Sequence, residues 1–197
     1  MAQSFYIVDI IGSIVAKTSE SVLPLLQQLS IQPTITGVHY LYGHHNEIKR
    51  RLIEKSNSNA TKYTRYPLIA LFQDFTEKHD GSGVVTANLQ LIIGYHSTAT
   101  KYMEDRYVHI FKPILYPIYE ALLTNIANDV RIGGMSKNNI EHEKIDRPHW
   151  GDPATYGNTG YIFSDVLDAI EVRNLKITID PLYCSKNSNK IHSFINN

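Results

Sequence analysis

The chain has 197 residues, of which 43% are apolar, so it is long and apolar enough for one ordinary domain with a buried core. Its 19 basic and 19 acidic side chains cancel, which removes any overall attraction to nucleic acid or to an anionic membrane surface. The single cysteine, Cys184, excludes an intrachain disulfide and a cysteine-based zinc site, and no apolar run approaches the ~20 residues of a membrane span.

The first 40 residues predict a helical extension. Apolar residues recur at helical spacing from Ser4 to Lys17, with Ser4 as the N-cap, and the segment lacks the basic start of a signal peptide. A second short helix is expected over residues 21–29, with Pro24 in its first turn. The single cysteine favours a reducing compartment.

A strand and a helix are expected next. TITGVHYLY, residues 34–42, is rich in β-branched and aromatic side chains, which favours a strand. NEIKRRLIEKS, residues 46–56, carries its apolar residues on one helical face, with Asn46 as the N-cap. A polar loop over residues 56–64 follows.

The segment RYPLIALFQDF contains the densest predicted strand. Apolar side chains occupy both pleat faces from Leu68 to Phe72, which indicates a strand that is buried on both sides. Pro67 has no N–H to donate, so it belongs at the beginning of that strand. Residues 84–97 alternate as a second strand, and the loop 76–83 joins the two as a hairpin.

The longest helical pattern runs from Glu104 to Asp129. Pro113 and Pro117 lie inside it, which predicts a break near Lys112 or a strong kink. The apolar stripe that is expected to face the core comprises Val108, Phe111, Leu115, Ile118, Leu122 and Ile126.

The last third of the chain predicts a loop, a strand and a tail. Residues 131–160 are rich in glycine, proline and asparagine and are expected to form a long irregular loop. Residues 163–179 alternate again, and the break in phase at Arg173-Asn174 predicts a bulge or a turn. With a C-terminal tail or arm over residues 181–197, the order predicts one α+β domain over residues 1–180, a mainly antiparallel sheet packed against helices.

The segment EHEKIDRPHWGD gathers imidazole and carboxylate groups, which suit zinc or another divalent cation. The candidate ligands are Glu141, His142, Glu143, Asp146, His149 and Asp152. Their spacing matches no metalloenzyme motif, because HExxH is absent, so we interpret the segment as a charged surface loop. A metal-dependent enzyme that uses His142 and His149 is kept as an alternative. No nucleophile or phosphate-loop motif occurs elsewhere, so neither an enzyme nor a cofactor is expected.

A local basic stretch permits a second alternative, a nucleic-acid-binding module. Its candidate contacts to DNA phosphates or to an acidic partner are Lys49, Arg50, Arg51, Lys62 and Arg65. The other interpretation is the solvated side of a short helix, because Glu47 and Glu54 dilute the charge and Arg50 can pair with Glu54 four residues on.

The 13 tyrosines indicate protein–protein contact, because tyrosine offers a large contact area with little loss of entropy. Several occur where exposure is expected, including Tyr102, Tyr107 and Tyr161. The predicted interface residues are Tyr63, Tyr66, Pro67, Tyr95, Trp150 and Tyr156. The alternative is that each ring caps the core and points its hydroxyl at water.

The order of these segments resembles a known family. NEIKRRLIEKS leads through a polar loop into YPLIALFQDF, and then come LQLIIGYHST, the proline-paired helix FKPILYPIYEALLTNI and the late strand LDAIEVRNLKITI. Over roughly residues 40–180 this order resembles the tail-terminator and head–tail connector proteins of tailed bacteriophages, in particular the neck ring proteins of crAss-like podophages. The N-terminal 40 residues and the loop 131–160 depart from the compact terminators.

The resemblance implies a structural virion protein in the neck or tail, assembled in the bacterial host. It implies a homo-oligomeric ring of six or twelve copies, stacked against portal, connector or tail proteins, with packaged DNA passing through the lumen. The matching contact elements would be the strand Tyr66 to Phe72 and the loops 56–64, 76–83 and 131–160. The family has no catalytic residues to carry over, and no membrane partner is implied.

Overall fold

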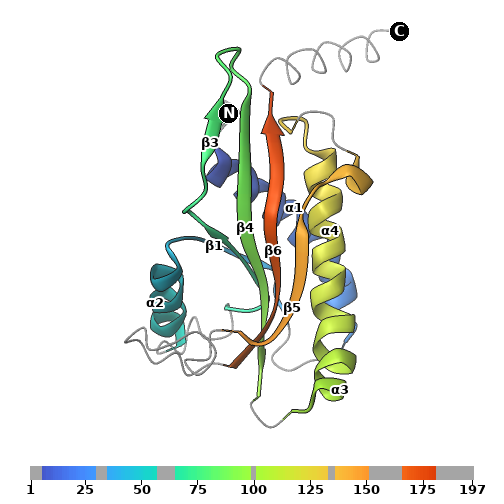
Figure 1. Ribbon diagram of the computed structural model, residues 1–197. Coiled ribbons are helices and arrows are strands. Elements are labelled where there is room, and N and C mark those ends of the chain that lie inside the picture. The colour runs from blue at the N-terminus through green and yellow to red at the C-terminus, as the bar shows by residue number, and fades with distance from the viewer. Residues whose placement is uncertain are drawn as a thin grey trace, which may run out of the picture.

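A computed structural model describes residues 6–29, 35–56, 65–98, 101–132, 136–150 and 166–180. It confirms the α+β class and the mainly antiparallel sheet. The long helices cover one face of the sheet and a shorter helix, α2, lies against the other face (Figure 1). None of the helices in the described ranges is both long and apolar enough to cross a membrane.

A single helix, α1 (Ile7–Gln27), replaces the two expected near the N-terminus. Its N-cap is Tyr6, whereas Ser4 lies outside the described residues. Pro24 removes one backbone hydrogen bond but stands close to the end of the helix, so little of the helix depends on that bond. The buried face continues across the proline through Val22 and Leu26, and this packing keeps the helix in one piece.

The sheet has the order β1-β2-β4-β6-β5, and within the described ranges the β1–β2 pair is parallel while the other pairs are antiparallel. The strands are β1 (His39–Gly43), β2 (Leu68–Phe72), β3 (Glu77–His79), β4 (Val85–Ser97), β5 (Glu143–Trp150) and β6 (Val166–Ile179). All five residues of β2 are buried, as predicted, because the strand is bonded on both edges and covered on both faces. The strand expected over 34–42 begins at His39, and the hairpin loop contains the short strand β3, which pairs with β4.

The prediction of an irregular loop over residues 131–160 is wrong for residues 143–150, which form β5. Among the described strands β5 pairs with β6 alone, and most of its side chains are exposed or half-buried. An edge strand of this kind carries charged residues and tolerates Pro148, so its sequence lacks the apolar alternation that indicates a strand. Residues 151–165 and the tail 181–197 lie outside the described residues.

The predicted bulge is confirmed. Leu89 lies opposite Leu175, whereas Leu91 lies opposite Val172, so one residue of β4 faces two residues of β6. Asn174, one of those two, has a φ of 52°, a conformation that asparagine adopts more readily than most residues.

Helix α2 (His45–Ser56) forms close to where it was expected. Asn46 is not the N-cap, because the helix already begins at His45. The backbone N–H of Asn46 instead donates to Nδ1 of His44, at 3.3 Å.

The long helix does not break at its prolines. It runs through α3 (Met103–Arg106), a π-helical segment over Tyr107–Leu115 and α4 (Tyr116–Asn128). Pro113 lacks an N–H and would crowd a carbonyl one turn earlier in an α-helix, and the wider π-helical turn accommodates it. Pro117 lies in the first turn of α4, where its missing N–H costs little.

Two apolar cores result, one on each face of the sheet. The larger core joins one face to α1 and to the long helix and includes Ile14, Leu91, Phe111 and Ile170. The smaller core joins the other face to α2 and includes Ile48, Leu52, Ile92 and Trp150. Helix α2 lies beside the lower part of the sheet and does not extend along its upper part (Figure 1).

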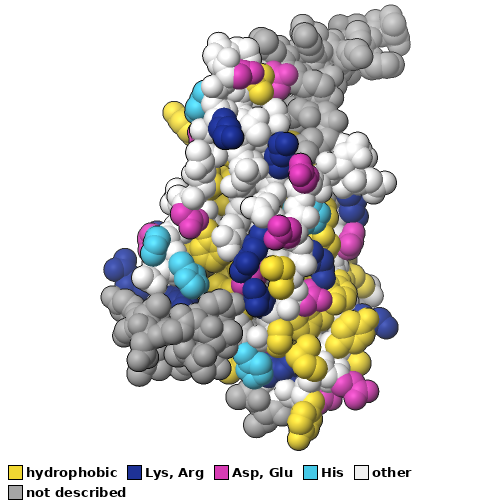
Figure 2. Space-filling view, viewed as in Figure 1, with side chains coloured by type: hydrophobic (Ala, Val, Ile, Leu, Met, Phe, Trp, Pro, Cys, Tyr) yellow, Lys and Arg dark blue, Asp and Glu magenta, His cyan; other side chains and the backbone are white. Residues whose placement is uncertain are grey.

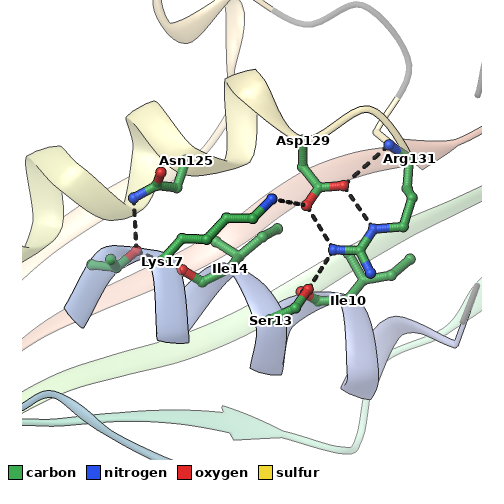
Figure 3. A network of polar contacts seen from close by, with 8 residues as sticks. Ile10, Ser13, Ile14, Lys17, Asn125, Asp129 and Arg131 are labelled. Carbon is green, nitrogen blue, oxygen red and sulfur yellow. Dashed lines mark hydrogen bonds and ion pairs between the residues drawn. The ribbon is translucent and has the colours of Figure 1, made fainter. Parts of the chain in front are cut away.

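A buried polar network ties α1 to the end of α4 (Figure 3). Arg131 donates to both carboxylate oxygens of Asp129, from Nε at 2.7 Å and from Nη2 at 2.6 Å, and also bonds Ser13 of α1. Lys17 adds a longer ion pair to Asp129 at 3.4 Å. Burial alone would raise the pKa of Asp129, but the hydrogen bonds and charge of Arg131, together with Lys17, lower it.

Replacing Asp129 by asparagine is expected to cost about 3 kcal/mol of unfolding free energy at neutral pH, since it leaves the buried Arg131 without its counter-ion. The folded pKa of Asp129 lies below its unfolded value, so the wild-type advantage is complete above about pH 4 and declines as the pH falls through the folded pKa. Urea unfolding of both proteins at neutral and acid pH measures this. Glu20→Gln, at an exposed position of α1, is the control. An Asp129→Asn difference that does not depend on pH would contradict the assignment.

Candidate functional site

The start of the long helix is held by a fully buried arginine. Arg106 is 0% exposed, and its guanidinium forms an ion pair with Asp168 of β6. It also donates to Oγ of Ser97 at 2.9 Å and to the carbonyl oxygens of Thr98 at 2.6 Å and Lys101 at 3.0 Å. These bonds fix α3 to the ends of β4 and β6.

The partner carboxylate is buried as completely as the arginine. Asp168 is 0% exposed, and the same oxygen that binds Arg106 lies 3.4 Å from the backbone N–H of His149. Its other oxygen has no hydrogen-bond partner among the described residues. A buried ion pair with an unsatisfied oxygen adds little net stability over apolar residues of the same volume. We therefore interpret the pair as a constraint on the position of α3.

The segment that Arg106 anchors exposes a cluster of large apolar side chains. Eight such side chains are exposed among the described residues, and four of them lie between residues 102 and 108, which makes a cluster rather than a scatter. They are Tyr102 at 82%, Met103 at 54%, Tyr107 at 48% and Val108 at 50% exposed. Hydrophobic side chains gather over this end of the long helix at the lower right of Figure 2.

We call this area the helix-start surface; it comprises the four apolar residues together with Glu104 and Asp105. Both carboxylates are exposed and lie in the first turn of α3, where the helix dipole favours negative charge. Neither forms a salt bridge with another described residue. The surface is therefore apolar with an acidic border.

The two sides of the helix-start surface differ in shape. On one side the ring of Tyr107 packs against Tyr116, with centroids 6.2 Å apart. Burial and a 2.7 Å hydrogen bond to Asp146 raise the pKa of Tyr116 to about 12, so it stays neutral. On the other side Val108 borders a groove of about 420 Å³, which Tyr95 and Pro113 also line. A partner would thus meet packed tyrosine rings on one side and a hollow on the other.

Sequence reasoning missed part of this surface. Val108 was expected on the buried stripe, but it is half exposed, whereas the other five residues of that stripe are buried. The π-helical turns shift the phase between Val108 and the later residues, and a periodic pattern cannot represent that shift. Nothing in the sequence singled out Arg106, which follows two carboxylates, Glu104 and Asp105, as an ordinary exposed arginine would.

Several predicted interface residues belong to the core of the chain itself. Tyr66 is 9% exposed, Trp150 is 3% exposed and Pro67 is buried, so the expectation that they face a neighbour is wrong. Their rings pack in or beside the smaller core, which needs large side chains under α2. Tyr95 is half-buried and lines the groove beside Val108. Tyr63, Tyr156 and Tyr161 lie outside the described residues.

The basic stretch does not form one unpaired cationic face. Lys49 is 3% exposed and burial lowers its pKa, while Arg50 and Arg51 each pair along α2, with Glu54 at 3.7 Å and Glu47 at 2.7 Å. Arg65 lies over the ring of Tyr66, 5.4 Å from its centroid. Lys62 is outside the described residues. Of the described part of this stretch, the side chains of Arg50 and Arg51 are 60% and 40% exposed.

The candidate metal ligands do not converge. His142 precedes β5 and His149 lies near its far end, so the extended chain separates them by roughly 20 Å. Both ring nitrogens of His142 are engaged, with the Tyr119 hydroxyl at 2.6 Å and the Ile140 carbonyl at 2.8 Å. Across the described ranges no group of three or more His, Cys, Asp or Glu side chains is arranged to hold a metal ion. Asp152 lies outside them.

A hollow of about 580 Å³ lies on the polar sheet face that α2 leaves open. Residues of both charge signs line it, including Lys78, Lys176, Glu141 and Glu143. Such a face is ordinary for an antiparallel sheet with one side in water, and it has no cluster suited to a reaction.

No protein-family model matches the chain, and a search of curated proteins finds no match either.

Replacing Arg106 by methionine is expected to lower the unfolding free energy by about 3–5 kcal/mol, because the Asp168 carboxylate is then buried without its partner. The double variant Arg106→Met/Asp168→Leu should recover most of that loss, since no charge is left buried. Urea unfolding of the wild type, both single variants and the double variant measures the coupling. Single and double variants of equal stability would show that the pair does not act as a unit.

Proposed function

We propose that this protein is a structural component of a tailed-phage virion, a neck or tail ring protein whose copies surround the channel for the genome. The observation that carries the proposal is the helix-start surface, because four large apolar side chains are exposed on a segment that a buried ion pair holds rigid. A rigid apolar cluster in water is typical of a protein–protein contact. The resemblance to neck ring proteins supplies the kind of assembly.

The open edges of the sheet agree with this role. Among the described residues, β1 and β5 each pair on one edge only, and β3 pairs only with β4. Such edges allow strand addition between neighbouring copies. Strand β2 is bonded on both edges within the subunit, so in this proposal it supports the sheet and leaves the contacts to other elements.

The partners are first of all copies of the same chain, in a ring of six or twelve, and then the portal, connector or tail proteins above and below. A net charge of zero limits repulsion among many copies. Packaged DNA in the lumen is a non-specific contact. A dedicated nucleic-acid module is less well supported, because Arg50 and Arg51 have glutamate partners on their own helix. A metal-dependent enzyme is less well supported because His142 and His149 lie apart.

The full chain is expected to form rings, alone at high concentration or when mixed with its neighbouring neck proteins. Analytical ultracentrifugation over a wide range of concentration gives the mass, and negative-stain images show whether the particles have a central channel. A protein that stays monomeric at all concentrations, and that joins no portal or tail complex, would overturn the proposal.

A further inference from the structure

We propose that the helix-start surface of one copy docks on a basic and aromatic surface on α2 of the next copy. This second area, the α2 surface, comprises Tyr42, His44, Arg50 and Arg51. The inference rests on the proposed ring assembly and names the contact that would build it. It combines an acidic, apolar surface with an arginine–tyrosine surface on a different flank of the chain, where Glu47 and Glu54 accompany the arginines.

The α2 surface presents cations next to an aromatic ring. The side chains of Arg50 and Arg51 are 60% and 40% exposed, and Tyr42 is 40% exposed. The guanidinium of Arg51 lies 5.8 Å from the centroid of the Tyr42 ring. Tyr42 is on β1, the outer strand of the sheet, and the arginines are on the helix that follows it. A partner with carboxylates and apolar groups fits this combination.

The arginines keep donors for such a partner. Arg51 uses one Nη atom for Glu47 at 2.7 Å, and Arg50 lies 3.7 Å from Glu54. Exposed ion pairs four residues apart on a helix are weak, so a better-placed carboxylate of a partner can replace them. A guanidinium has five N–H groups, and its forked geometry suits a bidentate carboxylate.

The helix-start surface supplies what the α2 surface lacks. Glu104 and Asp105 give two adjacent carboxylates without a salt bridge to any described residue. Tyr102, Met103 and Tyr107 supply the apolar centre, which an interface needs in order to exclude water from its charged pairs. The two areas thus have the acid–base and apolar–aromatic complementarity of a specific contact.

A contact between two helix-start surfaces is disfavoured, because it would bring the carboxylates of both copies together. The two proposed surfaces lie on different parts of the molecule, α2 at the left and α3 at the lower right of Figure 1. Each copy therefore uses one surface for its predecessor and the other for its successor. Such a heterologous contact closes into a ring when the rotation between copies divides a full turn.

Charge exchange tests this pairing with the full chain. The acid-reversed variant is Glu104→Lys/Asp105→Lys, and the base-reversed variant is Arg50→Glu/Arg51→Glu. Each alone places like charges across the contact, which costs several kcal/mol, so self-association should weaken by at least about 100-fold. The chain with all four substitutions, and an equimolar mixture of the two variants, should associate again. Glu20→Lys, on exposed α1, is the matched control and should associate as the wild type does.

Sedimentation velocity and circular dichroism give the readouts, the second to confirm that each variant is folded. A wild type that associates while both reversed variants associate equally well would overturn this pairing and leave the ring proposal intact. The pairing would also be overturned if both reversed variants lose self-association and neither the four-substitution chain nor the mixture restores it. A wild type that never associates would overturn the ring proposal itself.

A second variant tests the apolar part without a change of charge. Tyr102→Ser/Met103→Ser removes exposed apolar area, and serine is a favourable N-cap at position 102, so the helix itself should not weaken. Self-association should fall by about tenfold or more, since interface anchors of this kind are worth over 1 kcal/mol each. Unchanged association with an intact fold would remove these side chains from the contact.

Discussion

The ion pair between Arg106 and Asp168 is the constraint on which the rest of the structure depends. It joins the first turn of the long helix to the ends of β4 and β6, at a point where both side chains are fully buried. Apolar residues would fill the same space at lower electrostatic cost, but they would not fix the orientation of α3 relative to the sheet so closely. With its guanidinium also bonded to Ser97 and to two carbonyl groups, Arg106 allows α3 only one orientation relative to the sheet.

The position of α3 decides what the molecule offers to a partner. The π-helical segment Tyr107–Leu115 accommodates Pro113. Its wider turns shift Val108, at the start of the segment, out of phase with the buried stripe of the later residues. Val108 is exposed as a consequence, next to Tyr102, Met103 and Tyr107. An interior bond, a proline and a change of helical register thus combine to place an apolar cluster at the surface. The proposed neck ring assigns a partner to that cluster, and α2 of a neighbouring copy is the part of the chain whose charge complements it.

The main elements of the fold were predictable from the sequence because their apolar patterns are local. Leu68 to Phe72 read correctly as a buried strand, the phase break at Arg173-Asn174 as a bulge, and Tyr102 and Tyr107 as exposed. The predictions that were wrong concern features that depend on residues far away in the sequence or on the phase of the helical repeat. Strand β5 is held by β6 and has no apolar alternation of its own, Val108 changes face through the π-helical turn, and Tyr66 and Trp150 are buried by α2. The role of Arg106 could not be read from its neighbours in sequence, since Asp168 lies 62 residues away.

Hydrogen exchange measured on the associated and dissociated protein tests the central claim most directly, because it reports which backbone segments a partner covers. The account predicts slower exchange after association in two segments, residues 102–108 and the helix α2, with little change in β2 and in the middle of α4. Slower exchange confined to the open edges β3 and β5, with residues 102–108 exchanging as fast as in the monomer, would contradict it. In that case the buried Arg106–Asp168 pair would serve the fold alone.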